Sequence, residues 1–444
     1  MRSEIKTYTY PNGDIQRVQT VRWEDWSQLD FLNMSYSPKA LTCFSNIYRN
    51  FLVPSAPWLF GNMIMFHIPG DVDVPFPAHT GRYGQVADRL TAAAAAIKDG
   101  VKIADGKPVF RNEAVKAFWQ ALEERNSIQL IRGKLPTTTV IPLGDRPGYM
   151  TETETEAQLK VNANFFIMDR FDCATVYDQV GEPFGLCVKD GFVLRPPLYN
   201  REALLVKKNG SVSVKPMDVR ELEIEIHGEV FYHGKNATVY TRPGRLRTPR
   251  GKHLVIVGTK VVAVAEGSVE IPASGFVLCP KGKFEIAPGD TVTYRGLEDV
   301  VFGIQVGNSI LCNGVKTTAF HSKFYNIRHL EPVPYPPSLY PMDFAHARAA
   351  RIALGADKDG KPMLLWAEGA AKFGYQPGKG SCGASLAEMA EICADVGMFN
   401  AVNLDGGGSA QILLNNQRSL EISDRNREDH TEAERPVPFG LIIR

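Results

Sequence analysis

The chain has no marked excess of either charge and no long apolar run. Its 444 residues include 50 Lys or Arg and 49 Asp or Glu, which leaves a formal net charge of +1. No window approaches the roughly 18 consecutive apolar residues of a membrane-spanning helix. With no overall field to attract nucleic acid or an anionic membrane, neither partner is expected.

The cysteines show no pattern of disulfide bonding, because they are scattered, odd in number and without a CxxC pair. The seven are Cys43, Cys173, Cys187, Cys279, Cys312, Cys382 and Cys393. This pattern favours free thiols in a reducing compartment. The opening MRSEIKTYTYPNGD has no apolar core of signal-peptide length, so a cytoplasmic location is expected.

Metal-binding patterns are also scarce. The nine histidines show neither HxH nor HExxH spacing, so a zinc site has little support. Asp357, Asp359 and Asp405 offer oxygen ligands of the kind that calcium takes. The segment from Asp357 to Gly360 is nevertheless favoured as a hairpin turn. We therefore expect no cofactor, with calcium left open.

Residues 1–155 form an N-terminal region of unknown role. It is aromatic-rich at first and then carries two helical patterns. The first spans residues 85–98. Asn112 caps the second, which places Val115, Phe118, Trp119 and Leu122 on one face. A core-facing stripe is the favoured interpretation, with a substrate lid or partner surface as the alternative.

Residues 156–444 have a different texture. The part from 156 to 330 consists of short β segments separated by turn signals, and the Pro-rich stretch 331–341 predicts a stiff connector. Within 342–444, RIALGAD and KPMLLWAEG flank Asp359-Gly360, a hairpin signal. Ser385 and Glu388 form a capping box before a helix that ends at Gly397. The predicted fold is α+β, with mixed β-sheets and few helices, preceded by the two-helix N-terminal region.

The segment NLDGGGSAQI places Asp405 at the end of an apolar run, before Gly406, Gly407, Gly408 and Ser409. Glycine lets a ligand approach the backbone closely, and successive amides can converge on an anion. The Walker and dinucleotide motifs are excluded, because no Lys-Ser/Thr follows and the next segment is strand-like. A tight hairpin bend is the alternative without function.

A second carboxylate follows a neighbouring apolar segment, at Glu368-Gly369. If both segments belong to one sheet, Glu368 and Asp405 emerge at the same edge, as paired acids at a glycosidic bond would. Arg351, which opens the hairpin, is a candidate for recognition of a phosphate or carboxylate. Taken singly, each of these charges is more often a structural salt bridge.

These motifs resemble the phosphodiester glycosidase family over roughly residues 158–444. Asn403–Ser409 matches N-L-D-G-G-G-S, and residues 161–166 resemble N-G-G-F-F. Residues 351–360 resemble an arginine strand before D-x-D-G, and residues 434–438 resemble a closing R-P-V-P segment. There are two departures: Glu368-Gly369-Ala370 stands where D-G-R is usual, and Asn162-Ala163-Asn164 replaces the asparagine-glycine pair.

The resemblance implies hydrolysis of a sugar-1-phosphodiester, similar to N-acetylglucosamine-1-phosphodiester, with a carbohydrate substrate that carries a phosphate. Arg351 and the amides of Gly406 to Gly408 would bind the phosphate. Asp405 would activate water or support an oxocarbenium-like centre, with Glu368 as its partner. The remaining substrate-binding candidates are Asn162, Asn164, Ser409 and Arg435.

Two other functions stay open at this point. One is an exo-glycosidase or polysaccharide depolymerase acting on glycans without phosphate, which the missing arginine after Glu368 favours. The other is a non-catalytic module that binds a glycan or a nucleotide sugar in the glycine turn.

Overall fold

The structure is a computed structural model of the chain. It describes residues 1–33, 63–66, 72–74, 93, 96–97, 100–105, 107–125, 128–131, 139–142, 150–151, 156–166, 183, 185–197, 201–241, 248–269, 271, 275–320, 345–372, 374–426, 429–435, 437 and 439–444. The predicted connector 331–341 lies outside these residues.

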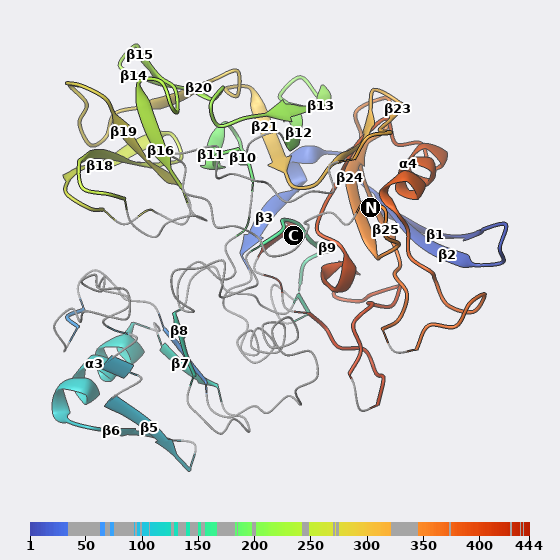
Figure 1. Cartoon of the computed structure of the whole chain (residues 1–444), viewed down its shortest axis with the longest axis horizontal. Helices are drawn as coiled ribbons and strands as arrows, with labels where there is room; N and C mark the ends of the chain where they lie inside the picture. The colour runs from blue at the N-terminus through green and yellow to red at the C-terminus, as the bar shows by residue number, and fades with distance from the viewer. Residues whose placement is uncertain are drawn as a thin grey trace.

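A seven-stranded antiparallel sheet forms the centre of the C-terminal half (Figure 1). Its order is β1 (Arg2–Thr9), β2 (Ile15–Arg22), β25 (Pro362–Ala367), β24 (Arg351–Ala356), β26 (Asn400–Asn403), β22 (Ser309–Cys312) and β23 (Val315–Lys316). Every residue of β24, β25 and β26 is buried. Strands buried on both faces need a layer on each side, and the molecule supplies both.

Helix α4 (Leu386–Asp395) covers one face of this sheet. The predicted capping box is confirmed, since Ser385 and Glu388 each bond the other's backbone amide. Leu386, Met389 and Cys393 are buried, and the last two share a core with residues of the sheet. Gly397 follows the helix with a φ of +86°, a conformation that favours glycine after a helix end.

A four-stranded antiparallel sheet covers the other face. Its order is β27 (Ile412–Leu414), β9 (Leu159–Asn162), β28 (Phe439–Ile443) and β3 (Asp30–Asn33). Leu159, Val161 and Ile412 share one core with Ile352 and Trp366 of the large sheet. The two sheets and α4 therefore form three layers around the segment that contains the glycine turn.

The middle of the chain forms a β-rich unit with its own core. One five-stranded sheet has the order β11, β10, β21, β12, β13, a three-stranded sheet β15, β14, β20, and a four-stranded sheet β16, β19, β17, β18. The bounds are β10 Cys187–Lys189, β11 Phe192–Arg195, β12 Arg201–Lys207, β13 Val212–Met217, β14 Glu223–Ile226, β15 Glu229–Phe231, β16 Ala237–Tyr240, β17 Lys252–Val257, β18 Lys260–Glu266, β19 Phe276–Pro280, β20 Val292–Arg295 and β21 Val300–Gln305. The predicted β-rich texture of this part, and a fold with few helices, are confirmed.

The expectation of two helices in the N-terminal region is wrong, because its described part is rich in strands. Besides β1 to β3 it contains β4 (Met63–Phe66), β5 (Val101–Ala104), β6 (Lys107–Phe110), β7 (Ile128–Ile131) and β8 (Thr139–Pro142). The helix capped by Asn112 is present as α3 (Glu113–Glu124), with its four predicted apolar residues buried. Most of the other expected helix, residues 85–98, lies outside the described residues. Helix propensity predicts α3. It does not predict the strand pairs around α3, because these depend on partners in other parts of the sequence.

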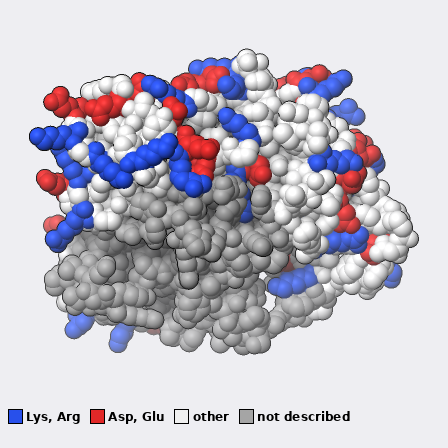
Figure 2. All heavy atoms as spheres, turned by 45° about the horizontal axis from the view of Figure 1, so that its top comes forward, with Lys and Arg blue, Asp and Glu red and all other residues white. Residues whose placement is uncertain are grey.

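Among the described residues, the distribution of charged side chains and the state of the cysteines match what the composition predicts. Basic and acidic side chains are interspersed over the described part of the face in Figure 2. The five described cysteines, Cys187, Cys279, Cys312, Cys382 and Cys393, are free thiols. Among the described residues, no helix combines the length and the apolar character needed to cross a membrane.

Candidate active site

Three predicted site residues meet at one edge of the seven-stranded sheet. Strands β25 and β26 flank β24, and both run antiparallel to it. Their C-terminal ends therefore lie beside the start of β24, where Arg351 pairs with Ala367. Glu368 follows β25, and Asp405 follows β26 by two residues. The two acids emerge at the same edge as predicted, although β24 separates their strands.

The glycine turn is tied to the sheets through its backbone. The Asp405 amide donates to Ala163 O at 2.8 Å, and the Gly407 amide donates to Ala350 O at 2.8 Å. The Gly406 amide donates to the Asp405 side chain, Oδ1, at 2.9 Å. The turn continues as a short 3₁₀ helix, Gly407–Ser409. The amides of Gly406 and Gly407, which the sequence assigned to phosphate binding, thus have acceptors inside the protein.

The glycines serve two different needs. Gly407 has a φ of +58°, a conformation that costs other residues strain. At Gly408 an added Cβ would lie 2.3 Å from both Arg435 Nη2 and Asp424 Oδ2. The turn therefore lacks a side chain at 408 because an ion pair packs directly on its backbone.

That ion pair joins Asp424 to Arg435. Arg435 Nε and Nη2 both approach Asp424 Oδ2, at 2.9 Å and 2.8 Å. The side chain of Asp424 is 19% exposed and that of Arg435 is 15% exposed. Arg435 is among the predicted substrate-binding residues but Asp424 is not, because no spacing in a polar loop distinguishes one aspartate from its neighbours.

Asn162 fastens the two ends of the turn. Its Nδ2 donates to Asp405 O at 2.6 Å, and its Oδ1 accepts from the Gln411 amide at 3.0 Å. Asn164 lies deeper, where its Nδ2 approaches Gln305 O at 3.5 Å and Cys187 Sγ at 3.9 Å. Burial raises the pKa of Cys187 to about 12, so this neighbour is a neutral thiol. Asn162, Asn164 and Ser409 are each 1% exposed.

Glu368 is 2% exposed and both of its oxygens accept two hydrogen bonds. Arg17 on β2 approaches in a bidentate manner, Nε to Oε2 at 2.6 Å and Nη2 to Oε1 at 2.8 Å. Ser381 Oγ also donates to Oε2, and the Glu421 amide donates to Oε1 at 2.8 Å. The carboxylate thus links three segments that are far apart in the chain.

Arg351 is 4% exposed and donates to backbone carbonyls. Its Nε donates to Ala384 O at 3.0 Å and its Nη2 to Ala347 O at 2.8 Å. These bonds hold the two segments that flank the edge of the sheet.

The predicted hairpin turn at Asp357 lies at the opposite end of β24. Asp357 Oδ1 accepts from the amides of Asp359 and Lys361, at 2.9 Å and 3.0 Å. This confirms the hairpin, and it places Asp357 and Asp359 away from Asp405.

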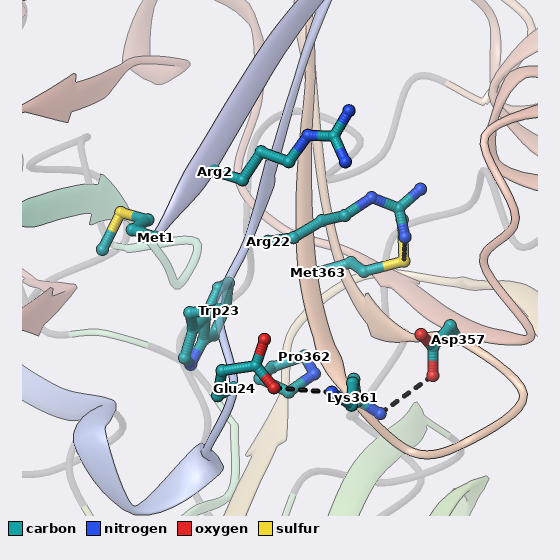
Figure 3. A pocket seen from close by; sticks show the side chains of 9 residues that line it. All are labelled: Met1, Arg2, Arg22, Trp23, Glu24, Asp357, Lys361, Pro362 and Met363. Carbon is teal, nitrogen blue, oxygen red and sulfur yellow. Dashed lines mark hydrogen bonds and ion pairs between the residues drawn. The ribbon is translucent and has the colours of Figure 1, made fainter.

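Hollows are present at two places on the part of the chain that the structure describes. One, of about 310 Å³, lies at the hairpin end and is lined by Met1, Arg2, Arg22, Trp23, Glu24, Asp357, Lys361, Pro362 and Met363 (Figure 3). There Lys361 pairs with Glu24 at 2.5 Å. The other, of about 440 Å³, is lined by Thr151, residues 416–421 and Glu432. This second hollow adjoins the loop that leads into Asp424.

A model of the phosphodiester glycosidase family matches residues 220–444, just over half of the chain. The chain belongs to the phosphodiester glycosidase family. The match ends at the last residue and includes the glycine turn and both members of the Asp424–Arg435 pair.

Curated relatives match this phosphodiester glycosidase over limited lengths. The N-acetylglucosamine-1-phosphodiester alpha-N-acetylglucosaminidase of Mus musculus is 30% identical over 154 residues, covering 33% of this chain and 24% of the mouse protein. The Homo sapiens protein of the same name is 34% identical over 100 residues, 22% of this chain and 18% of that protein. The match therefore spans about a quarter or less of these relatives.

Two solved structures are similar to this phosphodiester glycosidase. A hypothetical protein from Synechocystis has a TM-score of 0.45 at 15% identity, covering 100% of this chain and 62% of the other. The zebrafish N-acetylglucosamine-1-phosphodiester alpha-N-acetylglucosaminidase catalytic domain, auto-inhibited by its pro-peptide, has a TM-score of 0.37 at 13% identity, covering 100% and 82%.

One departure of this phosphodiester glycosidase from the expected pattern has a structural counterpart. Ala370 stands where an arginine is usual after the acid-glycine pair. Here the guanidinium beside Glu368 comes from Arg17 on β2. A cation is therefore present at this acid, but it is supplied by a strand 351 residues away in the sequence.

Proposed function

We propose that the protein hydrolyses the glycosidic bond of a sugar-1-phosphodiester, of the kind exemplified by N-acetylglucosamine-1-phosphodiester. Membership of the phosphodiester glycosidase family and the activity named for the mouse relative support this. The observation that carries the proposal is the exposure of Asp405. It is partly exposed at the edge of the sheet, whereas Glu368 and Arg351 are 2% and 4% exposed.

In the proposed reaction, water attacks the anomeric carbon. The bond from that carbon to the phosphate oxygen breaks, and its electron pair leaves with a phosphomonoester. Asp405 accepts the proton of the attacking water or, as the alternative, supports the oxocarbenium-like centre. Because a phosphodiester is a weakly basic leaving group, its departure needs charge stabilisation more than protonation.

Glu368 and Arg351 act in this proposal as positioning residues. The four hydrogen bonds to Glu368 tie Arg17 and Ser381 to the segment that begins at Glu421. Arg351 braces Ala347 and Ala384. Asn162 likewise sets the shape of the turn through its bonds to both ends. A carboxylate held by rigid neighbours loses little free energy to reorganisation during the reaction.

The first test is activity on a panel of sugar-1-phosphodiesters, UDP-N-acetylglucosamine and neutral aryl glycosides, with released sugar measured by mass spectrometry. We expect release from phosphodiesters. Asp405→Asn should lower kcat about 10²- to 10⁴-fold with an unchanged melting temperature, because the variant loses its base but keeps its shape. Near-normal turnover by a folded Asp405→Asn enzyme would remove Asp405 from the chemistry.

The same panel separates the other two functions. Release only from neutral glycosides would identify an exo-glycosidase or depolymerase. Tight binding of a sugar phosphate without any release would identify a binding module. The proposed cytoplasmic location is tested separately, by fractionating cells that express the full-length protein.

A further inference from the structure

In the Asp424–Arg435 ion pair, which packs on the glycine turn, only some of the polar side-chain atoms take part in the pairing. Arg435 directs Nε and Nη2 to the same oxygen, Asp424 Oδ2. Within the described part of the chain, no hydrogen bond involves Arg435 Nη1 or Asp424 Oδ1. Guanidinium is a planar group with five donors, so an acid bound along one edge leaves the opposite edge available for a second anion.

The loop that carries Asp424 is held from several sides. The Ile422 amide donates to Glu432 Oε1 at 2.8 Å, and the Ala433 amide donates to Asp424 O at 3.0 Å. Arg425 donates to Glu421 Oε2 at 2.7 Å, and Glu421 is itself bonded to Glu368. These hydrogen bonds hold the loop in place and so fix the position of Asp424 beside Arg435.

The guanidinium of Arg351 is less accessible to a substrate than that of Arg435. It is 4% exposed as a residue, with bonds from Nε and Nη2 to backbone carbonyls. The side chain of Arg435 is 15% exposed and packs directly on the backbone of Gly408 in the glycine turn. Among these two candidates, the geometry favours Arg435 for contact with an anion.

We propose that Arg435 binds the phosphate of the substrate and that Asp424 is its positioning residue. This inference rests on the proposed function. One oxygen of Asp424 fixes the plane of the guanidinium on Gly408, and the free edge receives a phosphate oxygen. Arg435 then stabilises the charge of the departing phosphomonoester beside Asp405.

The test compares inorganic phosphate binding, measured by calorimetric titration, with steady-state kinetics on phosphodiesters and neutral aryl glycosides. Arg435→Met should weaken phosphate binding at least about tenfold, the loss expected for a charge-assisted hydrogen bond. It should raise KM or lower kcat for phosphodiesters far more than for neutral glycosides. Arg295→Met is the matched control, because Arg295 also pairs with an acid, Glu225 at 2.5 Å, but lies in the β-rich unit. It should change neither quantity.

Asp424→Asn and Gly408→Ala test the positioning. Each should weaken selectivity for phosphodiesters over neutral glycosides, while Arg435→Lys should restore part of the binding lost in Arg435→Met. Equal losses on both substrate classes, or unchanged phosphate binding in a folded Arg435→Met protein, would overturn the inference. If Arg435→Met does not fold, Arg435→Lys and Gly408→Ala decide by the same criterion.

Failure of this inference is distinguishable from failure of the proposed function. Phosphodiester turnover that survives loss of Arg435 would leave the function in place and refute the role of Arg435. Phosphate binding that requires Arg435, in a protein that hydrolyses no phosphodiester, would support the inference and refute the proposed reaction.

Discussion

At the scale of single residues, the acids Glu368, Asp405 and Asp424 differ in their surroundings. Glu368 accepts four hydrogen bonds in a buried position. Asp405 is partly exposed and bonds the first amide of the glycine turn. Asp424 uses one oxygen for Arg435. Because the sequence shows only that each is an acid, it could not rank them.

Glu368→Gln should destabilise the protein without acting on the chemistry. The substitution removes the negative charge to which Arg17 and Ser381 donate hydrogen bonds. We therefore expect the free energy of unfolding to fall by about 3 kcal/mol. Turnover per folded molecule, measured well below the melting temperature, should stay within about threefold of wild type. A loss of kcat as large as that of Asp405→Asn in a folded protein would instead make Glu368 part of the chemistry.

At the scale of elements, local signals were read correctly from the sequence. The Asp359-Gly360 turn and the Ser385–Glu388 capping box are confirmed, since the bonds that define them lie within four residues. The location of Asp424 was missed, because its partner Arg435 and the supporting Glu368 lie in other segments. Pairing of β2 with β25 likewise depends on residues more than 300 positions apart.

The turn between β15 and β16 should make stability depend on pH. Burial is the main cause that lowers the pKa of His233 from 6.5 to about 4. Between these values the unfolded chain binds a proton that the folded protein does not, so stability decreases as pH falls through this range. We expect a loss of about 2 kcal/mol between pH 7 and pH 5 from this group.

Urea unfolding at pH 7 and pH 5 measures this effect. His233→Gln should reduce the difference between the two pH values by about 2 kcal/mol. Equal pH dependence in wild type and His233→Gln would contradict the prediction.

At the scale of the whole molecule, the N-terminal hairpin belongs to the architecture of the site. Strand β2 pairs with β25 from Val18 to Arg22, and Arg17 binds Glu368. At the tip of the hairpin, Asp14 pairs with Arg348 at 3.0 Å. The hydrogen bond from Tyr375, followed by that from Asn12, lowers the pKa of Asp14 and so favours its charged form.

A fragment of residues 156–444, the range that the sequence predicts for the catalytic domain, should therefore not fold stably alone. It would expose the edge of β25 and leave Glu368 without Arg17. We expect aggregation or a melting temperature at least about 10 °C below that of the full chain, measured by circular dichroism and size-exclusion chromatography. A stable, monodisperse fragment with full activity would show that the hairpin is dispensable.

The pairing of β2 with β25 also determines when the protein can fold during its synthesis. Arg17 leaves the ribosome 351 residues before its partner Glu368. At about 5 to 20 residues per second, the nascent chain carries β2 for tens of seconds before β25 is available. Val18 and Val21, fully buried in the finished sheet, are without that partner strand throughout this interval. Productive folding of this enzyme therefore depends on protection of its N-terminal strands until β25 has been synthesised.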